Sequence, residues 1–74
     1  MSRAPRITGH ELIDALGKLG FSVVRARGSH QFLRHEDGRS TVMPAHSGET
    51  IGPGLLHKIL RDCQLSLDEL VDIL

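Results

Sequence analysis

Between residues 20 and 45 the apolar residues stop recurring at helical spacing and fall into short runs that are rich in Phe and Val. Three such runs, over residues 21–27, 30–35 and 39–43, are typical of β-strands. The dipeptide Asp37-Gly38 joins the last two runs, and Asp-Gly is a strong signal for a two-residue hairpin turn. The middle of the chain therefore predicts an antiparallel sheet of three strands.

A turn at these two residues also predicts the register of the hairpin. Leu33 would lie opposite Val42, and residue 45 would fall opposite residue 30. Alternation divides the second strand into two faces, one with His30, Phe32 and Arg34 and the other with Leu33 and His35. Each face of the hairpin carries an apolar pair, so the pattern does not decide which face packs against the helices. Pro44 should end the third strand or lie at an edge.

Three helices are predicted by signals at their first residues. Two of them begin with the capping-box pattern S/T-x-x-E, given by Thr8 with Glu11 and by Ser66 with Glu69. The first should cover residues 9–19, with Gly20 as a left-handed cap, and the other is a short C-terminal helix. The remaining helix should begin at Pro53 and end near Gln64. Its apolar face includes Cys63, which we expect to be a buried small side chain.

The resulting order is α-β-β-β-α followed by a short helix. Because the apolar stripes of the helices must cover one face of the sheet, we expect an α+β fold with a three-stranded antiparallel sheet packed on helices. This is the arrangement of double-stranded RNA-binding domains. A chain of 74 residues allows one domain, so we expect residues 1–74 to form it, with residues 1–6 as a flexible N-terminus.

Charge is divided along a chain whose formal net charge is zero. Residues 1–46 carry seven basic and four acidic side chains, whereas residues 47–74 carry two and five. The first part can present a positive surface to a polyanion such as RNA, or its charges only keep the surface soluble. The single Cys63 excludes an internal disulfide and favours a reducing compartment. With no apolar leader and no apolar run near the roughly 18 residues that span a bilayer, we expect a cytoplasmic protein without a membrane segment.

Gly28-Ser29-His30, between the first two predicted strands, is the main candidate for a functional site. An imidazole titrates near neutral pH, so it can accept or donate a proton in a cell. Glycine tolerates the backbone conformations that bring a turn close to a ligand. His30 is therefore the candidate catalytic or ligand-binding residue.

Motifs over nearly the whole chain resemble those of the HicA (YcfA-like) toxins, small mRNA interferases of HicAB toxin–antitoxin systems. In order they are Glu11-Leu12-Ile13, Gly20-Phe21, Arg25-x-x-Gly28-Ser29-His30, Arg34-His35-x-Asp37-Gly38-Arg39, Pro44-x-His46, Gly54-x-Leu56-x-x-Ile59-Leu60 and Leu65-Ser66-Leu67-x-Glu69. The resemblance implies an endoribonuclease that cleaves mRNA and blocks translation, with His30 as its catalytic residue. It also implies a HicB-type antitoxin that binds the toxin and masks His30. Met43 stands where a β-branched residue is more usual in the family.

A histidine suits this chemistry because RNA carries its own nucleophile, the 2′-hydroxyl. Cleavage needs a group that takes up the 2′-hydroxyl proton and positive charge near the phosphate, but no obligatory metal or cofactor. We expect His30 to be the general base. The phosphate would be held by basic side chains and by turn amides, for which the candidates are Lys18, Arg25, Arg27, Gly28 and Ser29. His46 is the candidate donor of a proton to the leaving 5′-oxygen, and the alternative is a histidine hydrogen-bonded at a strand end.

Two other functions stay open. The domain could bind RNA without cleaving it, because most proteins of this fold have no activity. A metal could instead be held by His30, His35 and His46 with Asp37 or Glu49, although no usual zinc-binding spacing is present. Otherwise His10, His35 and His57 are expected at solvated surface positions.

Overall fold

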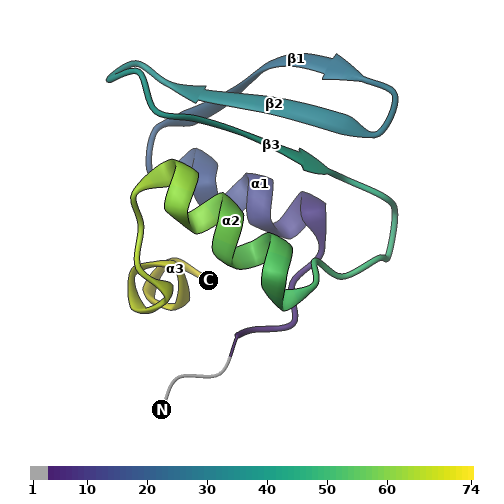
Figure 1. Cartoon of the computed structure of the whole chain (residues 1–74), viewed down its shortest axis with the longest axis vertical. Helices are drawn as coiled ribbons and strands as arrows, with labels where there is room; N and C mark the ends of the chain where they lie inside the picture. The colour runs from purple at the N-terminus through teal and green to yellow at the C-terminus, as the bar shows by residue number, and fades with distance from the viewer. Residues whose placement is uncertain (1–3) are drawn as a thin grey trace.

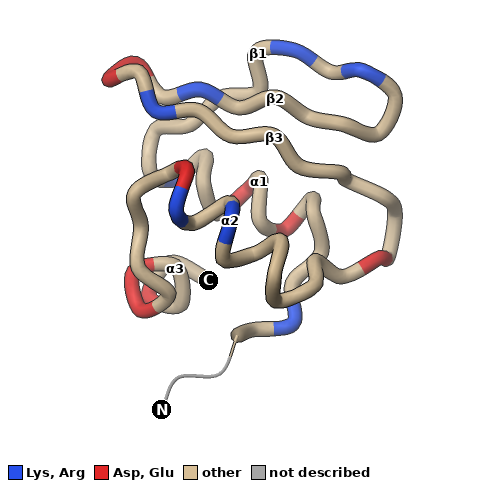
Figure 2. Tube along the Cα trace, viewed as in Figure 1, with Lys and Arg blue, Asp and Glu red and all other residues tan. Residues whose placement is uncertain are grey.

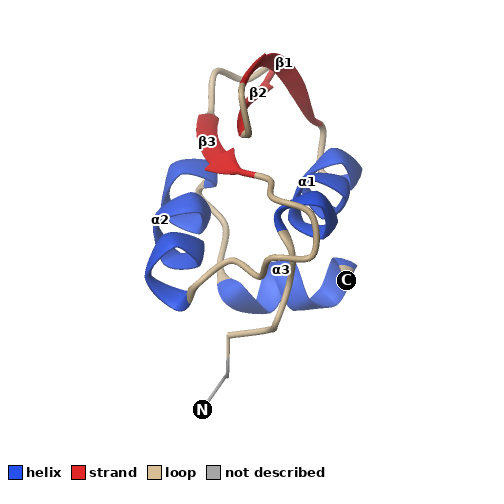
Figure 3. Ribbon diagram, turned by 90° about the vertical axis from the view of Figure 1, so that its right-hand side faces the viewer, coloured by secondary structure: helices blue, strands red, loops and turns tan. Residues whose placement is uncertain are grey.

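A computed structural model describes residues 4–74 of the chain. Its elements are α1 (Gly9–Lys18), β1 (Phe21–Arg27), β2 (His30–His35), β3 (Ser40–Pro44), α2 (Pro53–Cys63) and α3 (Leu67–Ile73). The strands form one antiparallel sheet in the order β1-β2-β3 (Figure 1). α1 packs under β1 and α2 under β3, and α3 lies on the side of these helices away from the sheet (Figure 3). The predicted α+β fold, with its helices on one side of the sheet, is confirmed.

The predicted helix starts are present. Thr8 and Glu11 form the capping box of α1, and Ser66 and Glu69 form that of α3. In each box the backbone N–H of the capping residue donates to the glutamate, which lowers the pKa of the Glu11 and Glu69 carboxyls. α1 ends at Lys18, one residue earlier than predicted. α2 begins at Pro53 and ends at Cys63, and its C-cap residue Gln64 has a left-handed φ of 55°.

The core lies between the sheet and the helices and is made mainly of Leu and Ile. Its largest fully buried side chains are Leu12, Leu16, Leu33, Met43, Leu56, Ile59, Leu70 and Cys63. Leu33 faces the helices, so His30, Phe32 and Arg34 occupy the outer face of the sheet. Cys63 is buried as expected, and desolvation raises the pKa of its thiol to about 11. The thiol is therefore neutral at physiological pH and serves packing.

The predicted register between β2 and β3 is wrong by one residue. Leu33 pairs with Thr41 rather than Val42, and His30 pairs with Pro44 rather than residue 45. The turn holds three residues instead of two, and it ends on Gly38, whose φ is 101°. β3 consequently begins one residue later than predicted. It ends at Pro44 on an edge of the sheet, as expected.

The three-residue turn is held by side-chain bonds that the Asp-Gly signal does not include. The Asp37 carboxylate accepts from the backbone N–H of Arg39 at 3.0 Å and from its Nε at 2.8 Å. The Arg39 guanidinium also donates to the carbonyl of Cys63 at 2.6 Å, at the end of α2. The turn is thereby tied to the last residue of α2, which lies 24 residues beyond Arg39 in the chain.

Residues 1–3, part of the expected flexible N-terminus, lie outside the described residues. Ala4 is partly buried against the core. Within residues 4–74, every helix falls short of the length and apolarity that crossing a membrane requires.

Candidate functional site

β1 and β2 are joined by the two-residue turn Gly28-Ser29, and His30 is the first residue of β2. Gly28 has a φ of 59°, whereas Ser29 does not have a positive φ. A positive φ at the first central residue alone is the pattern of a type II′ hairpin turn, which favours glycine there. A Cβ built on Gly28 would meet no atom within 4 Å. Glycine is thus favoured by backbone conformation, and the space beside the turn is open.

The His30 side chain is exposed on the outer face of the sheet. Its cross-strand neighbours are Arg27 on β1 and Pro44 on β3. Residues directly opposite in an antiparallel pair have Cβ atoms about 5 Å apart, so the Arg27 guanidinium can reach the space in front of the His30 ring. Among residues 4–74, no group hydrogen-bonds or ion-pairs with that ring. Both ring nitrogens are therefore available to a ligand.

His46 lies beside the same turn because the chain continues along it after β3. The backbone N–H of Ala45 donates to the carbonyl of Ser29 at 2.9 Å. The Ser29 Oγ and the His46 Nε2 are hydrogen-bonded at 3.3 Å. The structure thus brings two histidines to one end of the sheet: His30 follows Ser29 in the chain, and His46 is hydrogen-bonded to Ser29.

The basic residues predicted to hold phosphate are divided by the fold. Arg25 and Arg27 lie on β1, opposite Phe32 and His30 respectively. Lys18 is the last residue of α1, and its Nζ donates to the carbonyl of Ile73 at 3.0 Å. α1 begins beside the end of β3, so the helix carries Lys18 about 14 Å away from that end. Lys18 is therefore not among the residues gathered around His30.

The outer face of the sheet is positively charged. Arg25, Arg27 and Arg34 lie on it, and the three strands contain no Asp or Glu (Figure 2). Two acidic side chains beside the sheet are already paired: Asp37 of the β2–β3 turn with Arg39, and Asp62 of α2 with Lys58. A surface of this kind attracts phosphate groups.

We compared the chain with models of known protein families. The family described as the HicA toxin of bacterial toxin–antitoxin systems matches residues 9–65. The chain belongs to the HicA toxin family. The match covers α1, the whole sheet and α2, and it includes the turn, His30 and His46. The resemblance found in the motifs is confirmed, and the chain falls on the toxin side of a toxin–antitoxin pair. A comparison with curated proteins finds no match.

In this HicA chain, the expectation that His35 is solvated is wrong. Its ring packs edge-on against Phe21 with 5.1 Å between ring centroids, and 19% of its side chain is exposed. The backbone N–H of Asp37 donates to its Nδ1 at 3.1 Å. His35 thus belongs to the packing at the far end of β2. His10 and His57 are exposed, as expected.

The predicted alternative of a metal site is not supported by the placement of its residues. His30 and His35 lie at opposite ends of β2, roughly 16 Å apart along the strand. In the part of the chain that the structure describes, no three His, Cys, Asp or Glu side chains gather closely enough to hold a metal ion.

The sequence did not single out Phe32, which lies on the same face as His30 and under the guanidinium of Arg25. The alternation His30, Phe32, Arg34 was visible in the sequence. It became informative only when Leu33 was found to occupy the core.

Proposed function

We propose that this HicA-family chain is a metal-independent endoribonuclease in which His30 is the general base. The observation that carries the proposal is the position of His30. Its ring is exposed on a cationic face, opposite Arg27, with no group among residues 4–74 bonded to it. A general base that acts on a polymer must be accessible and must have an unoccupied nitrogen within reach of the substrate.

Each group of the site would have one role in the cleavage step. His30 would take the proton of the 2′-hydroxyl as its oxygen attacks the adjacent phosphorus. Arg27, which faces the same space, would stabilise the negative charge that develops on the phosphate oxygens. The bond from phosphorus to the 5′-oxygen breaks, and His46 would protonate that oxygen. The products are a 2′,3′-cyclic phosphate and a 5′-hydroxyl end.

The proposed substrate is mRNA, and the proposed partner is a HicB-type antitoxin that neutralises the toxin by covering His30. Membership of the HicA toxin family supports the existence of an antitoxin. The exposed position of His30 supports the mode of neutralisation, since a second protein can reach the ring. Both partners would be met in the cytoplasm.

The chemistry of the fragment ends tests the proposal. The purified chain, incubated with a labelled transcript in EDTA, should give fragments with 2′,3′-cyclic phosphate or 3′-phosphate ends and with 5′-hydroxyl ends. Direct labelling of the new 5′ ends by a polynucleotide kinase reports the hydroxyl. Fragments with 5′-phosphate ends would indicate attack by water, and activity lost in EDTA and restored by zinc or magnesium would indicate a metal. Binding without cleavage would identify an RNA-binding module.

The role of His46 can be separated from that of His30. His46→Ala should slow cleavage of RNA by about 10²-fold, because a general acid is lost. The same variant should cleave uridine 3′-(4-nitrophenyl phosphate) at close to the original rate, since its leaving group needs no proton. His46→Gln is the matched variant, because its amide can still bond to Ser29 but supplies no acid. Recovery of RNA cleavage in His46→Gln would assign His46 a structural role at the strand end.

A further inference from the structure

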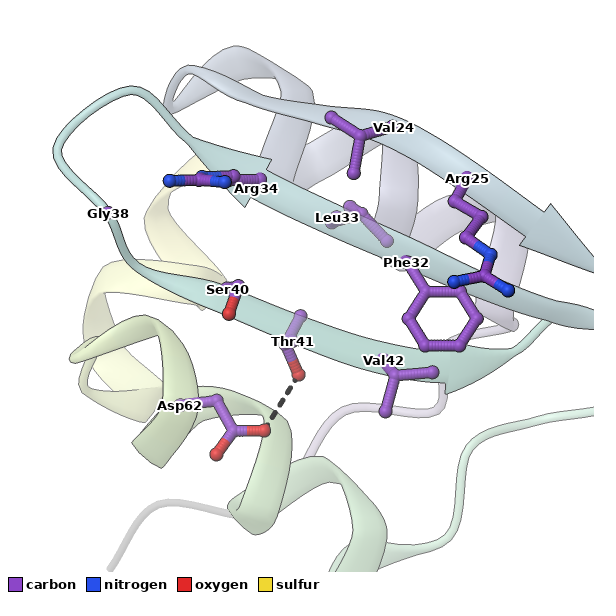
Figure 4. Close-up of a pocket in the computed structure, with 10 residues that line it drawn as sticks. All are labelled: Val24, Arg25, Phe32, Leu33, Arg34, Gly38, Ser40, Thr41, Val42 and Asp62. Atoms are coloured by element: carbon purple, nitrogen blue, oxygen red, sulfur yellow. Dashed lines mark hydrogen bonds between the residues drawn. The ribbon is translucent and has the colours of Figure 1, made fainter.

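The outer face of the sheet carries a shallow trough whose lining includes Phe32, two residues after the proposed general base His30. It has a volume of about 590 Å³ and lies over β2 and β3 (Figure 4). Phe32 and Val42 are among the apolar residues that line it, and Arg25 and Arg34 are the two basic ones. At the edge of β3 the trough reaches Asp62, whose carboxylate already accepts hydrogen bonds from Thr41 and Lys58, each at 2.9 Å. The acidic group at this edge is therefore engaged, and the charge inside the trough is positive.

Phe32 is an aromatic ring that the core does not use. The chain has two phenylalanines, and Phe21 is the buried one, with 4% of its surface exposed. Phe32 is partly exposed on the opposite face of the sheet, and the guanidinium carbon of Arg25 lies 5.5 Å from its ring centroid. A ring stacked with an arginine on an open surface is the arrangement that proteins use to bind an unpaired nucleobase.

The position of this pair relative to His30 is set by the sheet. Phe32 follows His30 by two residues, so both side chains lie on one face about 7 Å apart along β2. On β1, Arg25 and Arg27 lie opposite them in the same order. A strand that runs along β2 with a phosphate between His30 and Arg27 would therefore place a neighbouring base over Arg25 and Phe32.

We propose that Arg25 and Phe32 form a nucleobase shelf and that the substrate of this chain is single-stranded RNA. The inference rests on the proposed ribonuclease function and adds a binding site to it. In a duplex each base is stacked between its neighbours and has no free face for the shelf. The chain therefore resembles double-stranded RNA-binding domains in its fold, whereas the partly exposed Phe32 ring favours unpaired RNA as the substrate. Three arginines and no carboxylate on the strands favour a nucleic acid over a protein as the occupant of this face.

A series of ring variants tests the shelf. Phe32→Ala and Phe32→Leu should lower kcat/KM for a single-stranded oligonucleotide by about 5- to 100-fold, because one stacked base is lost. Phe32→Trp should retain or exceed the original kcat/KM. Phe32→Leu keeps an apolar side chain of similar reach, so its melting curve by circular dichroism should match that of the unchanged chain. The same oligonucleotide, annealed to its complement, should be cleaved at least tenfold more slowly.

An abasic nucleotide locates the base that occupies the shelf. The abasic nucleotide is placed at each position in turn on either side of the cleaved bond. At one position it should lower kcat/KM by a factor similar to that of Phe32→Leu. At that position the abasic substrate and the Phe32→Leu variant together should cost no more than either alone, since both remove the same contact.

Binding separates the shelf from the chemistry. In chains that carry His30→Ala, fluorescence anisotropy measures the dissociation constant of the labelled single strand without cleavage. Binding should weaken in Phe32→Leu and Phe32→Ala and be retained in Phe32→Trp. Cleavage and binding that are unchanged in Phe32→Leu would overturn the shelf and leave the ribonuclease function standing. Failure of the unchanged chain to cleave any RNA, with binding that still depends on the ring, would overturn the function and support the shelf. A Phe32→Leu chain that cleaves normally but escapes its antitoxin would overturn the shelf and identify an antitoxin-docking face.

Discussion

Replacing His30 with alanine should lower the rate of RNA cleavage by roughly 10² to 10⁴-fold, the usual contribution of a general base. The fold should survive, because the ring is exposed and makes no hydrogen bond with the described residues. Surface substitutions of this kind usually change stability by less than about 0.5 kcal/mol. We therefore expect an unchanged melting profile together with the loss of cleavage in vitro and of growth arrest in cells that express the chain.

His57→Ala is the matched control for this experiment. His57 is also exposed, but it lies on α2 and outside the group of residues around the turn. Its loss should leave cleavage and growth arrest intact. Continued cleavage by His30→Ala at the original rate would remove the basis of the proposed mechanism, and so would an equal loss of activity in both variants.

Gly9→Ala should destabilise the protein by about 1–3 kcal/mol, the usual cost of forcing an extra group into a packed site. A Cβ on Gly9 would lie 2.5 Å from the carbonyl oxygen of Pro44 and 2.8 Å from the Cα of Ala45. Both are backbone atoms, and the same segment pairs with His30 and bonds to Ser29. Relief of the overlap requires α1 or the end of β3 to move, which would also disturb the site.

Gly17→Ala in the same helix should change the stability in the opposite direction. A Cβ there meets no atom within 4 Å, so the variant should be more stable by up to about 1 kcal/mol through its higher helix propensity. Urea denaturation of the two variants and the unchanged chain measures both changes in unfolding free energy. The comparison requires that the three chains have the same slope of unfolding free energy against urea concentration. A Gly9→Ala chain as stable as Gly17→Ala would contradict the close packing of α1 against the end of β3.

The helix ends were predictable because their causes are local. A capping box such as Thr8 with Glu11 joins groups that are three residues apart, so its pattern is complete within a short stretch of sequence. The β2–β3 turn shows the limit of such signals. Asp37-Gly38 indicated a two-residue turn, but Arg39 binds both Asp37 and the carbonyl of Cys63, and the observed turn has three residues.

The central motif of the candidate site was predictable from the sequence, but the residues that surround it in space were not. Gly28-Ser29-His30 could be recognised as a motif because its residues are consecutive. His46, the candidate proton donor, lies beside this turn, although the predicted register that put residue 45 opposite residue 30 is wrong by one residue. Lys18 was grouped with Arg25 and Arg27 on charge alone, and the direction of α1 separates them.

Local patterns in this chain were sufficient for the three helices, the three strands, the connecting order and the family, because each is encoded within a few neighbouring residues or in their succession. Packing was needed to select the buried face of β2, the register of β3 and the neighbours of His30. These depend on contacts between residues far apart in the sequence, such as Leu33 with the helices and Ser29 with His46. Burial of Leu33 turns Phe32 and His30 outward together, and this places an aromatic ring beside the proposed catalytic histidine.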